Sequence, residues 1–241
     1  MVSRDDILWR AVENGDYLGV ESILQEGADI NMVNEKGENL LCEAIDGGDF
    51  DMIELLLDKG MDVNRVCDEG WCTPLSLAAS MSNVHIAKIL LKHGANPNRT
   101  HGLISPLEMA IKHGEFWYKM DMVQLLMRRG ANIFDCNPRG KTLLMFAAEQ
   151  MNVEVLHLLI ASGLDPEARD TKGHTAIYYA RNGKFDDNVA ILSDEIKRII
   201  HRRKSSEAFA LGNLSRTGES SLVNLLDPDL VALILQMHQD A

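Results

Sequence analysis

The sequence predicts an all-α fold: a solenoid of stacked helix-turn-helix units with short hairpin fingers, followed by a C-terminal helical tail. Three series of small residues recur along the 241-residue chain, and neighbours within each series are 32 to 38 residues apart. The series are Ala11, Ala44, Ala78, Ala110, Ala147 and Ala180; Gly27, Gly60, Gly94, Gly130 and Gly163; and Gly37, Gly70, Gly102, Gly140 and Gly173. Because three independent markers keep one period, chance does not explain the repetition.

Each unit begins with a turn and an inner helix. In the third unit, Thr73 followed by Pro74 is typical of an N-cap residue and the first helical position. The inner helix that follows is short and rich in alanine, which lets neighbouring helices approach closely. A polar break at 81–83 separates it from a second segment, where Ile86 and Leu90 have helical spacing. We therefore expect a second, outer helix in each unit.

The glycine after each outer helix predicts the helix end. Gly94 fits a C′ residue in the left-handed conformation, and the Asn that follows favours the turn to the next unit. No unit buries its own apolar face, so the units must stack to form one continuous core. We expect an array at 4–203, with units at about 4–34, 35–67, 68–101, 102–137, 138–170 and 171–203.

These units resemble ankyrin repeats. Thr73-Pro74-Leu75 matches the family's T-P-L triplet, and Gly94-Ala95-Asn96 matches its G-A-D turn. The match is divergent: the T-P-L triplet is intact in one unit only, and the histidine that commonly follows it is replaced. The resemblance implies a non-catalytic module that binds a protein partner on a concave face of fingers and inner helices.

The charge of the chain bears on its partners. The formal net charge is −12, and residues 1–196 carry 18 basic and 31 acidic residues, a net of −13. An acidic array argues against nucleic acid and favours a solvated surface or a basic protein partner. The N-terminus has no apolar signal region, and no run of about 18 apolar residues occurs. We expect no membrane association and a cytoplasmic location, with the basic run at 197–204 as an alternative nuclear-import patch.

No catalytic or metal-binding motif is present in the sequence. The phosphate-binding loop, H-E-x-x-H, G-x-S-x-G and the dinucleotide fingerprint are absent. The four cysteines, Cys42, Cys67, Cys72 and Cys136, form no CxxC pair. We expect no enzyme activity, no cofactor and no metal, and we expect the cysteines to be free, buried thiols.

Candidate partner-binding residues lie in the fingers. Trp71 is an aromatic anchor at a finger, and charged finger residues around it suit a polar rim. These charged candidates are Asp68, Glu69, Arg99, His101, Arg139, Arg169 and Lys172. An insertion near 115–120 adds Phe116, Trp117 and Tyr118, which either bind a partner or fold back over the neighbouring unit. Tyr178 and Tyr179 lie on an inner helix, where we expect core packing.

The tail predicts a linker and a helix. Residues 205–221 are rich in Ser and Gly, as is typical of a linker, and 222–238 have an apolar stripe with helical spacing. This helix bears a weak similarity to the start of an F-box, carried by Leu226, Pro228, Leu230 and Ile234. The similarity implies an adaptor that recruits a ubiquitin ligase. The alternative is a helix that packs on the array or self-associates.

Overall fold

The structure is a computed structural model of the whole chain. It describes residues 3–34, 37–66, 73–98, 104–113, 119–150 and 152–217, without the side chains of 200 and 203–217. The chain divides into two compact units: residues 1–192, which hold the array, and residues 193–241. The predicted all-α solenoid is confirmed in the first of these.

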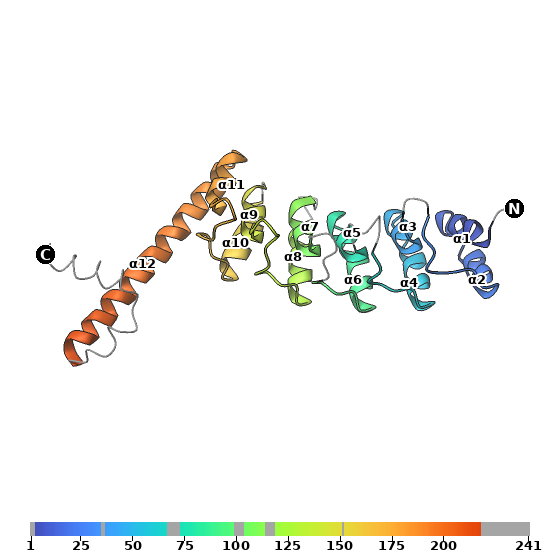
Figure 1. The fold of residues 1–241 in the computed structure, drawn as a ribbon, viewed down its shortest axis with the longest axis horizontal. Coiled ribbons are helices and arrows are strands. Elements are labelled where there is room, and N and C mark those ends of the chain that lie inside the picture. The colour runs from blue at the N-terminus through green and yellow to red at the C-terminus, as the bar shows by residue number, and fades with distance from the viewer. Residues whose placement is uncertain are drawn as a thin grey trace. The chain divides into compact units, whose positions relative to one another are not determined.

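In the described part of the chain, six pairs of antiparallel helices follow one another (Figure 1). The inner helices are α1 (Arg4–Glu13), α3 (Leu40–Asp46), α5 (Pro74–Ser80), α7 (Pro106–His113), α9 (Leu143–Ala148) and α11 (Ala176–Asn182). The outer helices are α2 (Tyr17–Gln25), α4 (Phe50–Asp58), α6 (Val84–Lys92), α8 (Lys119–Arg128), α10 (Val153–Ala161) and the start of α12 (Asp186–Thr217).

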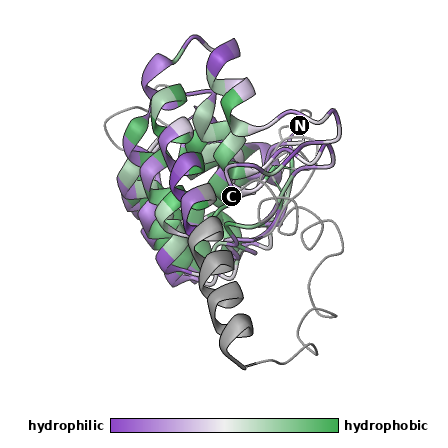
Figure 2. Cartoon of the chain, turned by 90° about the vertical axis from the view of Figure 1, so that its left-hand side faces the viewer, coloured by the Kyte–Doolittle hydropathy of each residue, from purple (hydrophilic) through white to green (hydrophobic). Residues whose placement is uncertain are grey.

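Packing between successive units follows the predicted periodicity. Each inner helix from α1 to α11 contacts the inner helix of the next unit, and α8 packs against both α6 and α10. All six marker alanines are buried, with at most 7% of each exposed. Figure 2 shows both apolar and hydrophilic positions on the helices and many hydrophilic ones in the loops. The buried side chains of all units form one continuous core, so each unit depends on its neighbours for burial.

Local turn chemistry sets the ends of the helices. Thr73 caps α5 by accepting a hydrogen bond from the backbone N–H of Ser76 at 3.1 Å, and Pro74 occupies the first turn. The five glycines after the outer helices, Gly27, Gly60, Gly94, Gly130 and Gly163, have φ between 84° and 92°. This is the left-handed conformation that we predicted for them.

Asparagine side chains link successive turns on the outer side of the array. Asn64 donates to the carbonyl oxygen of Gly94 at 3.1 Å and accepts from the N–H of Asn96 at 2.8 Å. Asn98, one unit later, repeats both bonds with Gly130 at 2.8 Å and Asn132 at 2.7 Å. These bonds satisfy polar backbone groups at the helix ends and fix the spacing between units.

The prediction of a linker at 205–221 is wrong for its first part, because α12 continues to Thr217. The segment contains good helix formers such as Glu207, Ala208 and Leu211 and has no proline. A single internal glycine, Gly212, costs only about 1 kcal/mol relative to alanine. The helix-forming neighbours therefore outweigh the Ser and Gly content on which the linker prediction depended.

Two cysteines differ from the expectation of buried free thiols. Cys42 is disulfide-bonded, and Cys136 is free but exposed. Among the residues that the structure describes, no group of His, Cys, Asp and Glu could hold a metal ion. In the same part of the chain, no helix combines the length and apolar character needed to cross a membrane.

Candidate partner-binding cavity

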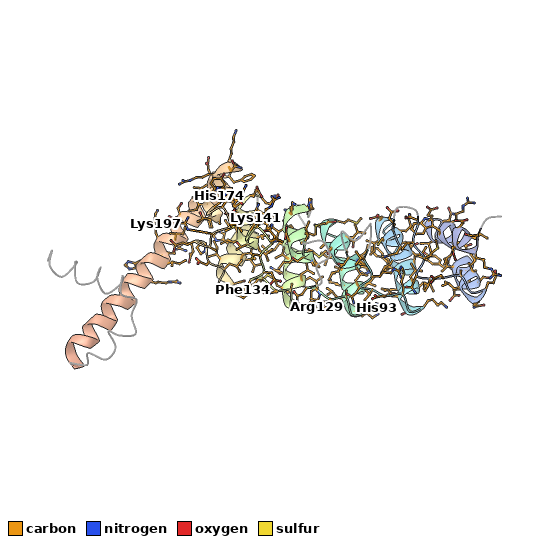
Figure 3. The ribbon with its side chains drawn as sticks, in the orientation of Figure 1. His93, Arg129, Phe134, Lys141, His174 and Lys197 are labelled. Carbon is orange, nitrogen blue, oxygen red and sulfur yellow. The ribbon has the colours of Figure 1, made fainter. Side chains whose placement is uncertain are left out.

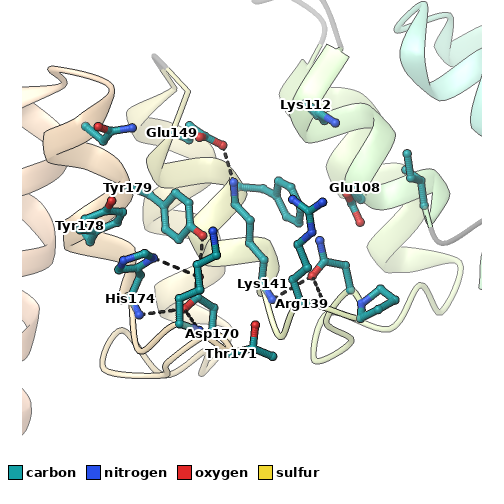
Figure 4. Close-up of a pocket in the computed structure, with 16 residues that line it drawn as sticks. Glu108, Lys112, Arg139, Lys141, Glu149, Asp170, Thr171, His174, Tyr178 and Tyr179 are labelled. Atoms are coloured by element: carbon teal, nitrogen blue, oxygen red, sulfur yellow. Dashed lines mark hydrogen bonds and ion pairs between the residues drawn. The ribbon is translucent and has the colours of Figure 1, made fainter.

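A cavity of about 580 Å³ lies in the last three units of the array. We call it the finger cavity. It is lined by two fingers and by side chains of α7, α9 and α11 (Figure 4). We number each finger by the unit that it leads into, so these are the fifth finger, at 133–142, and the sixth, at 166–175. Figure 3 shows Lys141 and His174 toward one side of the array and Phe134, Arg129 and His93 along its opposite edge. The cavity therefore lies on the face of fingers and inner helices.

A buried or half-buried Asn or Asp forms the base of each finger. In the fifth finger, Asn137 Oδ1 accepts from the backbone N–H groups of Arg139 and Lys141, both at 3.0 Å. In the sixth finger, Asp170 Oδ1 accepts from those of Lys172 at 2.9 Å and His174 at 2.8 Å. These side-chain-to-backbone bonds are typical of Asx turns, and they make both fingers defined structures.

The two fingers also contact each other directly. The backbone N–H of Thr171 donates to the carbonyl oxygen of Arg139 at 2.9 Å. A Cβ atom added to Gly140 would lie 3.3 Å from both Asp170 Cα and Thr171 N. The fingers are so close at this point that only glycine fits without a shift of backbone. This contact fixes the mouth of the finger cavity.

Asp170 and Tyr179 form a hydrogen-bonded polar pair at the cavity wall. The Tyr179 hydroxyl donates to Asp170 Oδ2 at 2.6 Å, and the Asp170 side chain is only 3% exposed. The hydrogen bond from Tyr179, aided by the backbone N–H groups of His174 and Lys172, lowers the pKa of Asp170 to about 2. Burial first, and then the bond to Asp170, raise the pKa of Tyr179 to about 12.

Lys141 is held between charged and aromatic groups. Its ammonium forms an ion pair with Glu149 and lies 4.3 Å from the ring centroid of Phe146 and 4.0 Å from that of Tyr179. Only 12% of its side chain is exposed. Such contacts compensate the loss of water around the ammonium. Lys141 is thus part of the cavity wall, and its charge is already paired.

Tyr178 presents an aromatic surface at the cavity. Its ring stacks on that of His174, with centroids 3.7 Å apart and planes within 2°. The residue is nevertheless 45% exposed. The expectation that Tyr178 packs in the core is therefore wrong: the stack on His174 fixes the ring while the side chain remains accessible. Tyr179, whose hydroxyl is bonded to Asp170, is half-buried and packs against the core as expected.

Replacing Tyr179 with phenylalanine is expected to reduce stability in a pH-dependent way. The pKa of Asp170 is below its ordinary 3.8, so its contribution is complete above pH 4 and is lost as pH falls towards 2. The pKa of Tyr179 is above its ordinary 10.0, so its contribution is complete below pH 10 and is lost as pH rises towards 12. Urea unfolding of both proteins measures the stability difference, which should be constant from about pH 5 to 9 and shrink on either side. A difference that does not vary with pH would contradict the assignment.

Three of the predicted partner-binding residues lie within the described part of the chain. Arg139 and Lys172 line the finger cavity and are exposed. Arg169 does not line it, and its guanidinium donates to the carbonyl oxygen of Gly173 at 2.9 Å. The other predicted residues lie outside the described residues: Trp71, Asp68, Glu69, Arg99, His101, Phe116, Trp117, Tyr118, Leu226, Pro228, Leu230 and Ile234.

Sequence reasoning missed the residues that build the cavity wall, namely Asp170, Lys141, His174 and Glu149. The sequence does contain a spacing pattern that points to some of these residues. Asn137 and Asp170 are 33 residues apart and each stands three residues before a finger glycine, while Lys141 and His174 follow those glycines. Aligning the fingers by their glycines would have brought these positions together.

Comparison with known proteins identifies the repeat. The family model described as ankyrin repeats (3 copies) matches residues 8–101 and 106–200. The chain belongs to the ankyrin repeat family. Ankyrin repeats are generally non-catalytic modules for protein–protein interaction, which agrees with the fold and with the exposed finger face. The comparison leaves the F-box-like similarity of the tail as a prediction.

Relatives share the ankyrin array within longer proteins. The "Transient receptor potential cation channel subfamily A member 1 homolog" of Caenorhabditis elegans is 32% identical over 190 residues, covering 78% of this chain and 15% of that protein. "Ankyrin repeat and SOCS box protein 2" of Homo sapiens is 46% identical over 59 residues, covering 24% of this chain and 8% of that protein. The chain therefore corresponds to a small part of each of these two relatives.

A solved structure shows the same architecture. It is titled "Bd0816 Predatory Endopeptidase from Bdellovibrio bacteriovorus in complex with immunity protein Bd3460". One of its chains matches with a TM-score of 0.67 and 25% identity, over 78% of this chain and 97% of that chain. The match confirms the ankyrin solenoid in three dimensions.

Proposed function

We propose that this ankyrin array binds a protein partner in the finger cavity, on the face of fingers and inner helices. One observation carries the proposal: two fingers locked by Asn137 and Asp170 enclose a cavity with the exposed Tyr178 at its wall. Rigid fingers lose little conformational entropy on binding, and tyrosine is enriched among residues that dominate binding energy.

Site-specific photo-cross-linking tests this proposal. A benzophenone side chain placed at Tyr178 should cross-link a partner protein in lysate of the source cells, and excess unmodified protein should compete. The matched control places the same group at His157, which is exposed on the outer helix α10. Equal cross-linking at the two positions, or none at Tyr178, would refute binding at this face.

A second candidate function is that of an adaptor that also recruits a ubiquitin ligase. Two observations favour it: the F-box-like pattern around Pro228 and a relative whose name combines ankyrin repeats with a SOCS box. Truncation after Thr217 should then abolish co-purification of a ligase adaptor while leaving the cross-link at Tyr178 unchanged. Retention of the adaptor after truncation would eliminate this role for the tail.

A further inference from the structure

The charges of the finger cavity divide into paired groups and accessible ones. Two of its three carboxylates are paired within the fold: Glu149 with Lys141, and Asp170 with Tyr179 and backbone N–H groups. The third, Glu108, is buried, with only 6% exposed. Burial raises the pKa of Glu108, so its charged form is disfavoured there. None of the three offers an accessible, unpaired negative charge.

The accessible charges that form no ion pair are all positive. Lys112, Arg139 and Lys172 line the cavity from α7, the fifth finger and the sixth finger, and all three are exposed. Figure 4 labels Lys112 and Arg139. Within the described part of the chain, none of them lies within ion-pair distance of a carboxylate, and Lys112 interacts electrostatically with the buried Glu108. A cluster of unpaired cations around one cavity is notable in an array whose residues 1–196 have a net charge of −13.

From these observations we infer that the finger cavity binds an acidic peptide segment of the partner, with Asp or Glu carboxylates on Arg139 and Lys172 and an adjacent side chain packed on the exposed Tyr178 ring. The inference rests on the proposed function. An arginine guanidinium can donate two parallel hydrogen bonds to one carboxylate, and charge-assisted hydrogen bonds are roughly twice as strong as neutral ones. The ring of Tyr178 is held by His174, so it can receive an apolar or aromatic side chain without being ordered first.

The acidic body of the array favours a short acidic segment over a nucleic acid. At physiological ionic strength, charges beyond about 8 Å are largely screened. A short segment within the cavity therefore interacts mainly with the three local cations. A long polyanion would extend over the surrounding surface, where acidic residues outnumber basic ones and repel it.

Selection from a random peptide library tests the inference without assuming a sequence. Twelve-residue peptides displayed on phage would be selected in parallel on the wild-type chain, on Arg139→Gln/Lys172→Gln and on Lys88→Gln/Arg181→Gln. The last variant removes the same charge from exposed residues of α6 and α11 that do not line the cavity. Peptides selected on the wild type and on the control should be enriched in Asp and Glu, and those selected on the cavity variant should not.

The affinity of one enriched peptide gives the quantitative result. Its Kd should rise about tenfold or more with the cavity variant, and similarly when its Asp and Glu are changed to Asn and Gln. Tyr178→Ala should also weaken binding, and added salt should weaken wild-type binding steeply. Absence of acidic enrichment, equal affinity for both charge variants, or displacement by an equimolar DNA duplex would overturn the inference. If the Tyr178 cross-link persists while acidic enrichment is absent, the proposed function stands and only the inference of an acidic peptide ligand is refuted.

Discussion

Replacing Leu90 with alanine is expected to lower the free energy of unfolding by about 2–5 kcal/mol. Leu90 is fully buried in α6, which packs against α5 and α8. The substitution removes apolar contact area and leaves a cavity. Urea unfolding followed by circular dichroism measures the change.

Leu18→Ala is the matched control for this prediction. Leu18 also lies in an outer helix, α2, but is 80% exposed. Its substitution should change stability by no more than about 0.5 kcal/mol. Similar losses for Leu18 and Leu90 would contradict the burial on which the array depends.

The Leu90 substitution should also alter how the array unfolds. Stability in a stacked array is approximately a sum of unit stabilities and interfaces between neighbours. Leu90 lies in the third unit, so a less stable third unit allows the first two units and the last three to unfold separately. The finger cavity belongs to the last three units, and we expect it to persist at urea concentrations where α6 has already unfolded.

The repeat could be predicted from the sequence because its markers have strict physical requirements. Ala44, Ala78 and Ala147 lie where inner helices approach closely, and all three are at most 3% exposed. Gly60 and Gly94 lie where φ is positive, which excludes most other residues. A position that only one type of residue can occupy carries that residue in successive units, and the period is therefore visible in the sequence.

The finger cavity could not be predicted in the same way because it depends on pairing between units. Arg139 and Arg169 are both arginines in fingers, yet the first lines the cavity and the second bonds the carbonyl oxygen of Gly173. Tyr178 and Tyr179 are adjacent and chemically alike, but one is exposed and the other is bonded to Asp170. The direction of each side chain decides these differences, and periodicity does not report it.

Replacing Gly140 with alanine is expected to destabilise the array by about 1–3 kcal/mol and to weaken peptide binding in the finger cavity. Gly140 has φ of 70°, which costs a residue with a Cβ atom roughly 1–2 kcal/mol. In addition, the new Cβ would lie 3.3 Å from Asp170 Cα and Thr171 N. Relief of this contact requires the fingers to move apart, which displaces Asp170 and the mouth of the cavity.

Gly173→Ala separates these two effects. Gly173 has φ of 82°, but an added Cβ would meet no atom within 4 Å. This variant should therefore lose only the stability that depends on the positive φ, and it should retain its affinity for the peptide. The two glycines hold the same position in adjacent fingers. The difference between the two variants in lost free energy of unfolding therefore isolates the contribution of the contact between fingers. Equal losses of stability together with equal peptide affinities would show that the close approach at Gly140 does not position the cavity.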